Sequence, residues 1–382
     1  MESFGIEEEY FVVDPATRNL VPRVPAGLIG EARQRLGRDC VARELLQSQV
    51  ELVSPVYAGT AEARASMVGL RRGLCDAARA HGLELVAAGS HPFGMWREQT
   101  PTAKPRYARL IDDFQIVGRR NLLCGMHVHV GVGEGIDRIV LMNRLMSWLP
   151  VFLALSTSSP FWNRDRTGLL SYRQAAYDEW PRTGIPDFFE SQRDHDAFVR
   201  LLVGAGAIDG GGSLWWAIRP SAQHPTLELR IADCCTDVDD ALAIAALFRC
   251  LVRAHLRRPG LGRARSSMTR RVIDENRWLA KRHGLDAAFI DEFSSSVRSF
   301  RSVLDALLAV VAEDVEALDC GREIAHLDVL LRRGTSAHRQ LELYHRCIDA
   351  GATRTEALRG VVDWLIDTTR PGASGMRCTP GD

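Results

Sequence analysis

The chain has 382 residues, of which 46% are hydrophobic and 25% are charged. These proportions are those of an ordinary globular protein, and they exclude a disordered chain, a collagen and a continuous coiled coil. Lysine and arginine together number 48, as do aspartate and glutamate, so the net charge is zero and we expect no nucleic-acid partner.

The first 260 residues alternate between strand-like and helix-like patterns. Period-2 alternation predicts strands over residues 4–13, 47–53, 83–88, 125–132, 215–218 and 226–232. Helical spacing predicts helices over residues 61–81, 106–121, 136–156, 195–203 and 237–257. The stretch 139–155 is strongly apolar, but Asn143, Arg144 and Pro150 within it indicate a buried helix rather than a membrane span.

Beyond residue 260 nearly the whole pattern is helical. We expect helices over residues 267–283, 287–317, 326–349 and 356–368. We therefore expect a single catalytic domain over residues 1–382. It would consist of an antiparallel sheet with helices up to residue 260, a helical subdomain over 261–370 and a frayed tail over 371–382.

The cysteines and the first residues bear on the cellular location. Nine cysteines are present without a C-x-x-C pair, which excludes the zinc-ribbon and thioredoxin signatures. The acidic start, MESFGIEEEYF, lacks the basic region and the apolar core of a secretory signal. Because free thiols persist in a reducing compartment, we expect a cytoplasmic protein without a membrane anchor.

Four predicted strands gather their polar side chains on one face, because side chains at positions i and i+2 point the same way. These polar faces carry Glu7 and Glu9, then Gln47, Gln49 and Glu51, then His127 and His129, and finally Glu228 and Arg230. They contain no lysine, and at least three of the strands have an apolar opposite face. If the strands are neighbours in one antiparallel sheet, the polar faces form one wall.

Such a wall favours bound cations. Carboxylates that lie close together repel each other, so their pKa values rise or their charges stay unpaired unless cations neutralise them. A carboxylate-rich set with one or two histidines suits Mg²⁺ or Mn²⁺ better than zinc. Carboxylate-bound Mg²⁺ ions hold the phosphates of ATP, and Arg219 and Arg230 can each grip a phosphate or a carboxylate through two hydrogen bonds.

Each motif taken alone also has a purely structural explanation. The run from Glu7 to Glu9 is compatible with an exposed acidic terminus, and the pair Glu228 and Arg230 with a cross-strand salt bridge. His127 and His129 fit surface histidines, or a zinc site in a metal-dependent hydrolase. An inactive scaffold of the same fold is a third possibility. The coincidence of all four motifs favours a shared metal site.

The chain resembles the carboxylate-amine ligases of the glutamate–cysteine ligase type 2 family, whose fold is related to that of glutamine synthetase. The matching motifs are GIEEEYFVVD at 5–14, QVELVSPV at 49–56, GMHVHVGV at 125–132, SPFW at 159–162, TGLLSYR at 167–173, TLELRIAD at 226–233, ENRW at 275–278 and GTSAHRQ at 334–340. The resemblance implies an α+β fold. A curved antiparallel sheet would carry metals on one face and helices on the other, with a helical C-terminal block.

The resemblance also implies roles for individual residues. The metal ligands would be Glu7, Glu9, Glu44, Glu51, His127 and Glu228. Glu44 stands seven residues before Glu51, so it would need a β-bulge or a position before the strand to share the face. Arg230 would contact ATP and, with Arg219, bind substrate and act in catalysis, while His129 would lie on the substrate side.

The implied reaction is ATP-dependent formation of an amide. The γ-carboxylate of glutamate would take the γ-phosphoryl group of ATP, and an amine such as cysteine would then displace phosphate from the acyl phosphate. The cofactor would be Mg²⁺ or Mn²⁺, with ATP as co-substrate. The family resemblance also implies a homodimer.

Overall fold

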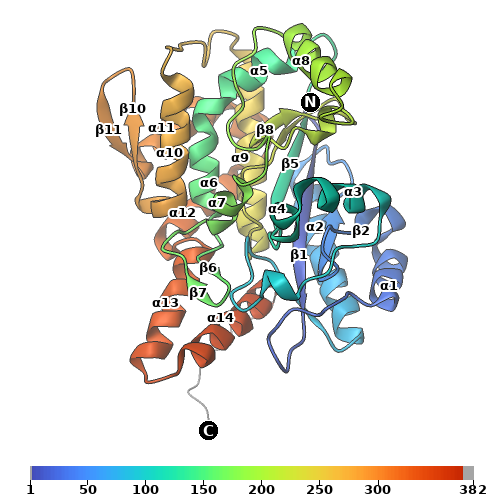
Figure 1. Cartoon of the computed structure of the whole chain (residues 1–382). Helices are drawn as coiled ribbons and strands as arrows, with labels where there is room; N and C mark the ends of the chain where they lie inside the picture. The colour runs from blue at the N-terminus through green and yellow to red at the C-terminus, as the bar shows by residue number, and fades with distance from the viewer. Residues whose placement is uncertain (1, 373–382) are drawn as a thin grey trace.

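The computed structural model describes residues 2–372, which form a large antiparallel sheet covered by helices (Figure 1). The strands of this sheet are β1 (Phe4–Val13), β2 (Val41–Arg43), β3 (Gln49–Val53), β4 (Glu84–Val86), β5 (Met126–Gly131), β8 (Ile218–Pro220) and β9 (Thr226–Leu229). Within residues 2–372 the sheet has seven strands in the order β2-β3-β1-β5-β9-β8, and β4 pairs with the end of β1. Every pairing is antiparallel, which confirms the α+β fold class with an antiparallel sheet.

One face of the sheet is apolar because side chains alternate along each strand. In β1, Phe4, Ile6 and Tyr10 are buried on this face, whereas Glu7 and Glu9 on the other face are partly exposed. The helices that cover the apolar face are α2 (Thr60–Ala80), α5 (Arg138–Leu145), α6 (Leu149–Ser156) and α9 (Val238–Arg257). Helices α2, α5 and α9 contact strands of the sheet, and α6 packs against α9.

The apolar stretch predicted as a buried helix lies inside the protein. The helical run Arg138–Ser156 is long and apolar enough to cross a membrane, but 78% of its most apolar window is buried. Its two parts, α5 and α6, both pack against α9. The burial is that of a core helix, as the polar residues within the stretch predict.

The part of the chain after residue 260 is mostly helical, as the sequence predicts. Its helices are α10 (Thr269–His283), α11 (Phe300–Ala317), α12 (Gly321–Arg333), α13 (Ser336–Asp349) and α14 (Arg354–Thr369). Helices α11 and α12 pack against α9, α10 packs against α6, and α14 reaches β4. This helical block therefore packs mainly on the helices that cover the apolar face.

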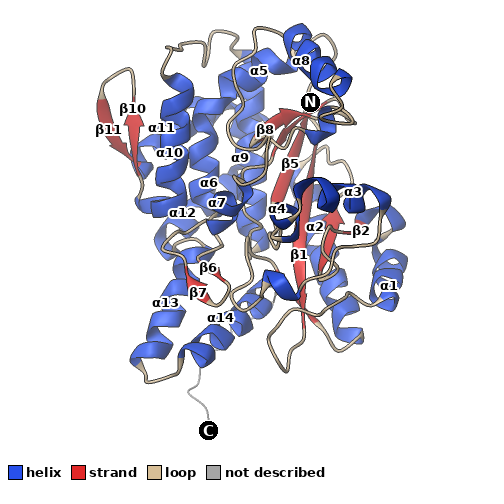
Figure 2. Cartoon of the chain, viewed as in Figure 1, coloured by secondary structure: helices blue, strands red, loops and turns tan. Residues whose placement is uncertain are grey.

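The single helix predicted over residues 287–317 is wrong in its first part. A hairpin of β10 (Ala288–Asp291) and β11 (Ser296–Ser299) precedes α11 and stands apart from the large sheet (Figure 2). The Asp291 carboxylate accepts hydrogen bonds from the backbone N–H groups two and three residues later, and Ser295 has a φ of 51°. Both features stabilise a turn and end the helical pattern there.

Two other predicted helices are interrupted. Residues 326–349 belong to two helices, because Gly334 has a φ of 79° and Thr335 caps the second of them. Residues 106–121 are divided at Gln115, whose φ of 48° lies outside the helical region. Periodicity continues across both breaks, so the pattern alone does not reveal them.

The remaining elements are short. They are α1 (Ala26–Leu36), α3 (Pro105–Phe114), α4 (Ile116–Arg119), α7 (Tyr172–Tyr177), α8 (Gln192–Gly204), β6 (Phe161–Trp162) and β7 (Asp165–Arg166). The sequence pattern missed α1, α7, β2, β6 and β7, and the strand predicted over 215–218 begins only at Ile218. The tail predicted over 371–382 lies outside the described residues from position 373 onward.

Helix α7 is anchored to the helical block through α10. Arg277 and Lys281 of α10 each donate a hydrogen bond of 2.7 Å to the carboxylate of Asp178, the residue that follows α7. The backbone N–H groups of Leu170 and Ser171 donate to the Lys281 carbonyl oxygen at 2.8 and 3.1 Å. The orientation of α7 therefore depends on α10 as well as on the sheet.

Glu8 forms a buried ion pair on the apolar face of the sheet. The Arg71 side chain of α2 donates to Glu8 through Nε at 2.8 Å and through Nη2 at 2.5 Å, and neither side chain is exposed. Arg71 also donates to the carbonyl oxygens of Cys235 and Thr236, both at 2.9 Å. The pair joins β1, α2 and the segment after β9, so the interpretation of this acidic run as exposed is wrong for Glu8.

Because His91 is buried as a neutral imidazole, we expect the free energy of unfolding to fall in acid. Its buried Nδ1 accepts backbone hydrogen bonds from Phe93 and Gly94 at 3.2 and 2.9 Å, which requires the neutral imidazole, and burial lowers the pKa of His91 to about 3. Because the unfolded chain binds this proton near pH 6.5, stability is fully present above that pH and declines as the pH falls toward 3. At pH 5 the expected loss is about 2 kcal/mol.

Denaturant unfolding at pH 7.5 and pH 5 measures this loss. The matched variant is His91→Asn, whose amide oxygen keeps an acceptor but does not titrate, and we expect it to lose less stability between the two pH values. An equal loss in both proteins would contradict the assignment.

Candidate active site

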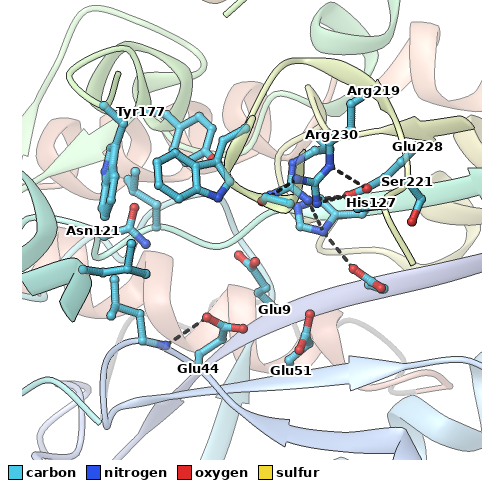
Figure 3. A pocket seen from close by; sticks show the side chains of 18 of the residues that line it. Glu9, Glu44, Glu51, Asn121, His127, Tyr177, Arg219, Ser221, Glu228 and Arg230 are labelled. Carbon is cyan, nitrogen blue, oxygen red and sulfur yellow. Dashed lines mark hydrogen bonds and ion pairs between the residues drawn. The ribbon is translucent and has the colours of Figure 1, made fainter. Parts of the chain in front are cut away.

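A cavity of about 360 Å³ opens on the polar face of the sheet (Figure 3). It is lined by every residue that the sequence analysis assigned to the site: Glu7, Glu9, Glu44, Glu51, His127, His129, Arg219, Glu228 and Arg230. These side chains come from β1, β3, β5 and β8, from β9 and the residue after it, and from the end of β2. The structure therefore brings together residues that are more than 200 positions apart in the chain.

Strand register explains this convergence. Glu9 of β1 lies directly opposite Glu51 of β3, and Glu7 lies opposite His127 of β5. On the far side of β5, His129 is opposite Glu228. Directly paired residues point to the same face of a sheet, so the polar faces predicted for separate strands merge into one wall.

One cluster of carboxylates consists of Glu9, Glu44 and Glu51. Each offers an oxygen, and the three oxygens lie within 4.8 Å of one another. The backbone N–H of Gly125 donates to Glu9 at 2.6 Å, and that of Leu45 donates to Glu44 at 2.9 Å. Among residues 2–372, no lysine, arginine or histidine forms an ion pair with any member of this acidic trio.

The electrostatics of the acidic trio follow from burial without a neutralising partner. Burial and the neighbouring Glu44 charge raise the pKa of Glu9 to about 7. Burial and then the charges of Glu44, Glu7 and Glu9 raise the pKa of Glu51 well above its usual value. A divalent cation would remove this repulsion, and three carboxylate oxygens are ligands that Mg²⁺ and Mn²⁺ accept.

Glu44 reaches the site without the bulge that a single strand would require. It follows β2, a separate short strand that pairs with β3 in antiparallel register, with Ala42 opposite Glu51. The chain reverses between the two strands, so Glu44 and Glu51 approach each other despite their seven-residue separation. Of the two options that the sequence left open, a β-bulge or a position before the strand, Glu44 takes the second, and β2, which the sequence pattern did not reveal, brings it there.

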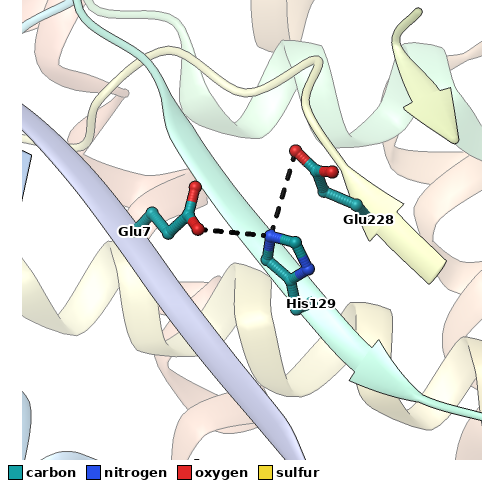
Figure 4. A group of neighbouring side chains, drawn as sticks. All are labelled: Glu7, His129 and Glu228. Carbon is teal, nitrogen blue, oxygen red and sulfur yellow. Dashed lines mark ion pairs between the residues drawn. The ribbon is translucent and has the colours of Figure 1, made fainter. Parts of the chain in front are cut away.

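A second cluster consists of Glu7, His129 and Glu228 (Figure 4). His129 Nε2 lies 3.4 Å from a Glu7 oxygen and 3.9 Å from a Glu228 oxygen, and Nδ1 lies 3.0 Å from the Thr226 hydroxyl. Burial alone would raise the pKa of Glu7, but hydrogen bonds with His127 and His129 lower it well below its usual value. The cluster contains His129, which the sequence analysis placed on the substrate side, together with the predicted ligands Glu7 and Glu228.

His127 lies beside this second cluster. Its Nδ1 is 3.0 Å from Glu7, and burial together with the Arg230 charge lowers the pKa of His127 to about 4. Its Nε2 is buried and has no hydrogen-bond partner among residues 2–372. A neutral imidazole with a free nitrogen is competent to bind a metal ion, so the role of His127 as a ligand stays a prediction.

Two arginines surround Glu228. Arg219 donates to it through Nε at 2.8 Å and Nη2 at 3.3 Å, and Arg230 forms a further ion pair with it. Burial raises the pKa of Glu228, but the charges of Arg230 and then Arg219 lower it well below its usual value. Arg219 Nη1 also donates to the carbonyl oxygens of Gly212 and Leu214. The predicted phosphate contact of Arg219 would therefore compete with these partners.

The sequence analysis missed the aromatic wall of the cavity. Tyr107, Tyr177, Trp180 and Trp215 line it, and the two tryptophans pack together with a ring-centroid distance of 5.3 Å. It also missed Arg173 of α7, although this residue ends the quoted TGLLSYR motif. Strand periodicity does not reach Tyr107, Arg173, Tyr177 and Trp180, because they lie in short helices and loops outside the sheet. Trp215 stands in the strand predicted over 215–218, but it precedes β8 and was not assigned to the site.

Comparisons with known proteins place the chain in a family. Residues 3–363 match the family described as Glutamate-cysteine ligase family 2. A protein of Bradyrhizobium sp. (strain ORS 278), provisionally named glutamate–cysteine ligase 2, is 42% identical over 99% of this chain and 90% of its own length. One of the same provisional name from Ectopseudomonas mendocina is 44% identical over 96% of this chain and 97% of its own.

Solved structures show the same fold. The glutamate–cysteine ligase of Francisella tularensis in complex with AMP has a TM-score of 0.69 at 12% identity, covering 97% of this chain and 89% of that one. A bifunctional glutathione synthetase from Pasteurella multocida also has a TM-score of 0.69, at 14% identity, over 96% of this chain and 52% of that one. Together with the match over residues 3–363, the relatives establish that the chain belongs to glutamate–cysteine ligase family 2.

Proposed function

We propose that this member of a ligase family is an ATP-dependent carboxylate–amine ligase that joins the γ-carboxylate of glutamate to an amine such as cysteine. The observation that carries the proposal is the acidic trio of Glu9, Glu44 and Glu51 beside the Glu7, His129 and Glu228 cluster. Glu7 and Glu9 are two residues apart on one strand face, so their backbone positions are about 6.7 Å apart along β1. The two clusters therefore offer neighbouring groups of cation ligands on one wall of the cavity.

Divalent cations bound by these residues would neutralise the phosphates of ATP and favour their transfer. Arg230, whose buried Nε has no partner among residues 2–372, would contact the phosphoryl group as it moves. A glutamate carboxylate oxygen attacks the γ-phosphorus and the bond to the ADP oxygen breaks, giving an acyl phosphate and ADP. The amine nitrogen then bonds to the acyl carbon, the carbon–oxygen bond to phosphate breaks, and the nitrogen loses a proton.

The experiment is a screen for ADP release with Mg²⁺, glutamate and a panel of amines that includes cysteine. We expect ADP release to require Mg²⁺ and both organic substrates. With ¹⁸O in the glutamate γ-carboxylate, the released phosphate should carry one ¹⁸O atom, because the attacking oxygen leaves with phosphorus. Absence of ADP release with every amine, or phosphate without the label, would contradict the proposed reaction.

The hydrolase alternative is less well supported. Nδ1 of His127 lies against Glu7 and Nδ1 of His129 against Thr226, and both rings stand among more carboxylates than a typical zinc site contains. Metal-dependent hydrolysis without ATP would favour it over the ligase. The cytoplasmic location, the homodimer and the absence of nucleic-acid and membrane partners stay predictions from the sequence.

A further inference from the structure

Arg173 faces the cavity from α7, outside the sheet. Its side chain is only 4% exposed, and it lines the cavity together with Glu9. Nη1 donates to the Ala232 carbonyl oxygen at 3.0 Å and lies 3.8 Å from the carboxylate of Asp233. Within residues 2–372, neither Nε nor Nη2 of Arg173 has a hydrogen-bond acceptor. The guanidinium lies over the Tyr177 ring, with Cζ 5.5 Å from the ring centroid, and its unused donors are available to a ligand in the cavity.

Arg173, Arg219 and Arg230 differ in the carboxylates with which they form ion pairs. Arg219 and Arg230 both pair with Glu228, at the end of the cavity that holds His129. Arg173 has one carboxylate neighbour, Asp233 at 3.8 Å, and its charge, like that of Arg230, acts on Glu9 of the acidic trio. Arg173 therefore has donors left for a ligand near the acidic trio, whereas Arg230 acts both on Glu228 and on the trio.

Gly125 leaves space for this guanidinium because it has no side chain. A Cβ at position 125 would lie 2.2 Å from Arg173 Nη2, so the approach requires glycine. The N–H of the same glycine donates to Glu9 at 2.6 Å. One residue thus brings the Arg173 guanidinium and the acidic trio next to each other.

Asp233 holds Arg173 in this orientation. The fully buried Asp233 carboxylate accepts hydrogen bonds from the Ser159 hydroxyl at 2.7 Å, the Ser171 hydroxyl at 2.9 Å and the Ser158 backbone at 3.1 Å. Ser159 Oγ in turn accepts from the backbone N–H of Arg173 at 2.9 Å. Three donors fix the orientation of the carboxylate behind the guanidinium, while burial raises the pKa of Asp233 above its usual value.

We propose that Arg173 binds an oxyanion of a substrate at the end of the cavity formed by the acidic trio, and that Asp233 is its positioning residue. The oxyanion is either the carboxylate to be activated or the phosphoryl group that it receives, since both present the paired oxygens that a guanidinium fork accepts. The proposal rests on the ligase function and adds to it a substrate contact outside the sheet.

The main test compares Arg173→Gln with the wild-type enzyme in the ADP-release assay. We expect kcat/KM to fall by about 100-fold, as for other lost oxyanion donors. A raised KM for glutamate with unchanged Mg·ATP binding identifies the carboxylate, whereas weaker Mg·ATP binding or a lower kcat alone identifies the phosphoryl group. Arg301→Gln, on the exposed surface of α11, is the matched control. Kinetic constants and Mg·ATP affinity within twofold of wild type would overturn the proposal.

Two further readouts separate substrate binding from a structural role. Guanidinium ion should restore activity to Arg173→Ala but not to Glu51→Gln, because only the first variant leaves a guanidinium-shaped space. Asp233→Asn should change the same kinetic constant as Arg173→Gln, by a smaller factor, and should add little in the double variant. If Arg173→Gln fails to fold, Asp233→Asn is compared with the wild type instead. If the effects of the two substitutions on the kinetic constant are additive in the double variant, Asp233 does not position Arg173.

A binding measurement keeps the proposal independent of turnover. Inorganic phosphate, titrated by calorimetry in the presence of Mg²⁺, is expected to bind Arg173→Gln at least 10-fold more weakly than wild type. If the wild-type protein releases no ADP with any amine but phosphate binding still depends on Arg173, the ligase reaction fails and the oxyanion site stands. Equal affinity of the two proteins for phosphate and, in a parallel titration, for glutamate contradicts the oxyanion site, whether or not ADP is released.

Discussion

Glu51→Gln is expected to lower the rate of ADP release by at least about 10³-fold, the upper range for the loss of one preorganised charged contact. Glu51 faces Glu9 across the β1–β3 pair and shares a cluster with Glu44. An amide oxygen is a weaker cation ligand than a carboxylate, so the variant should lose the cation that the acidic trio would hold. Wild-type turnover in this variant would remove Glu51 from the site.

The same substitution should act on stability in the opposite direction when no metal is present. Burial and three neighbouring carboxylates raise the pKa of Glu51, so a neutral amide relieves repulsion and the melting temperature of the metal-free variant should rise. Adding Mg²⁺ should raise the melting temperature of the wild type more than that of the variant. Glu313→Gln, at an exposed position of α11, serves as the control and should respond to Mg²⁺ like the wild type.

Glu8→Gln is expected to lower the free energy of unfolding by about 3–5 kcal/mol, because it leaves the Arg71 guanidinium buried without its counter-charge. Arg71→Met should cost a similar amount, since it strands the Glu8 carboxylate. The double variant should be more stable than the sum of the two losses predicts, because it buries neither charge alone. Urea unfolding of the four proteins measures the coupling, and strictly additive losses would show that the pair does not act as a unit.

The sequence predicted the wall of the cavity well, for a simple physical reason. The alternation of side chains places Glu7 and Glu9, His127 and His129, and Glu228 each on a defined face of its strand. Burying the apolar face then leaves one orientation for all the strands. The convergence of these residues follows from that constraint, whereas the contacts of the His127 and His129 rings depend on ring orientation and could not be read from alternation.

The parts that the sequence did not predict depend on long-range contacts or on local backbone geometry. Glu44 needed β2, a three-residue strand too short to show a period. Arg173 reaches the cavity through contacts with Ala232 and Asp233, about 60 positions later in the chain. The hairpin after α10 depends on a turn at Asp291 that a helical pattern conceals.

The anchoring of α7 by Asp178 has a consequence for the whole last third of the polypeptide. Every acidic and imidazole group of the wall lies before residue 260, so a shortened protein ending there would retain all of them. It would nevertheless lose Arg277 and Lys281, which hold the segment that carries Arg173 and Tyr177. The C-terminal helices thus support the segment that lines the cavity. Selection for activity would therefore also act on residues such as Arg277 and Lys281, which do not line the cavity themselves.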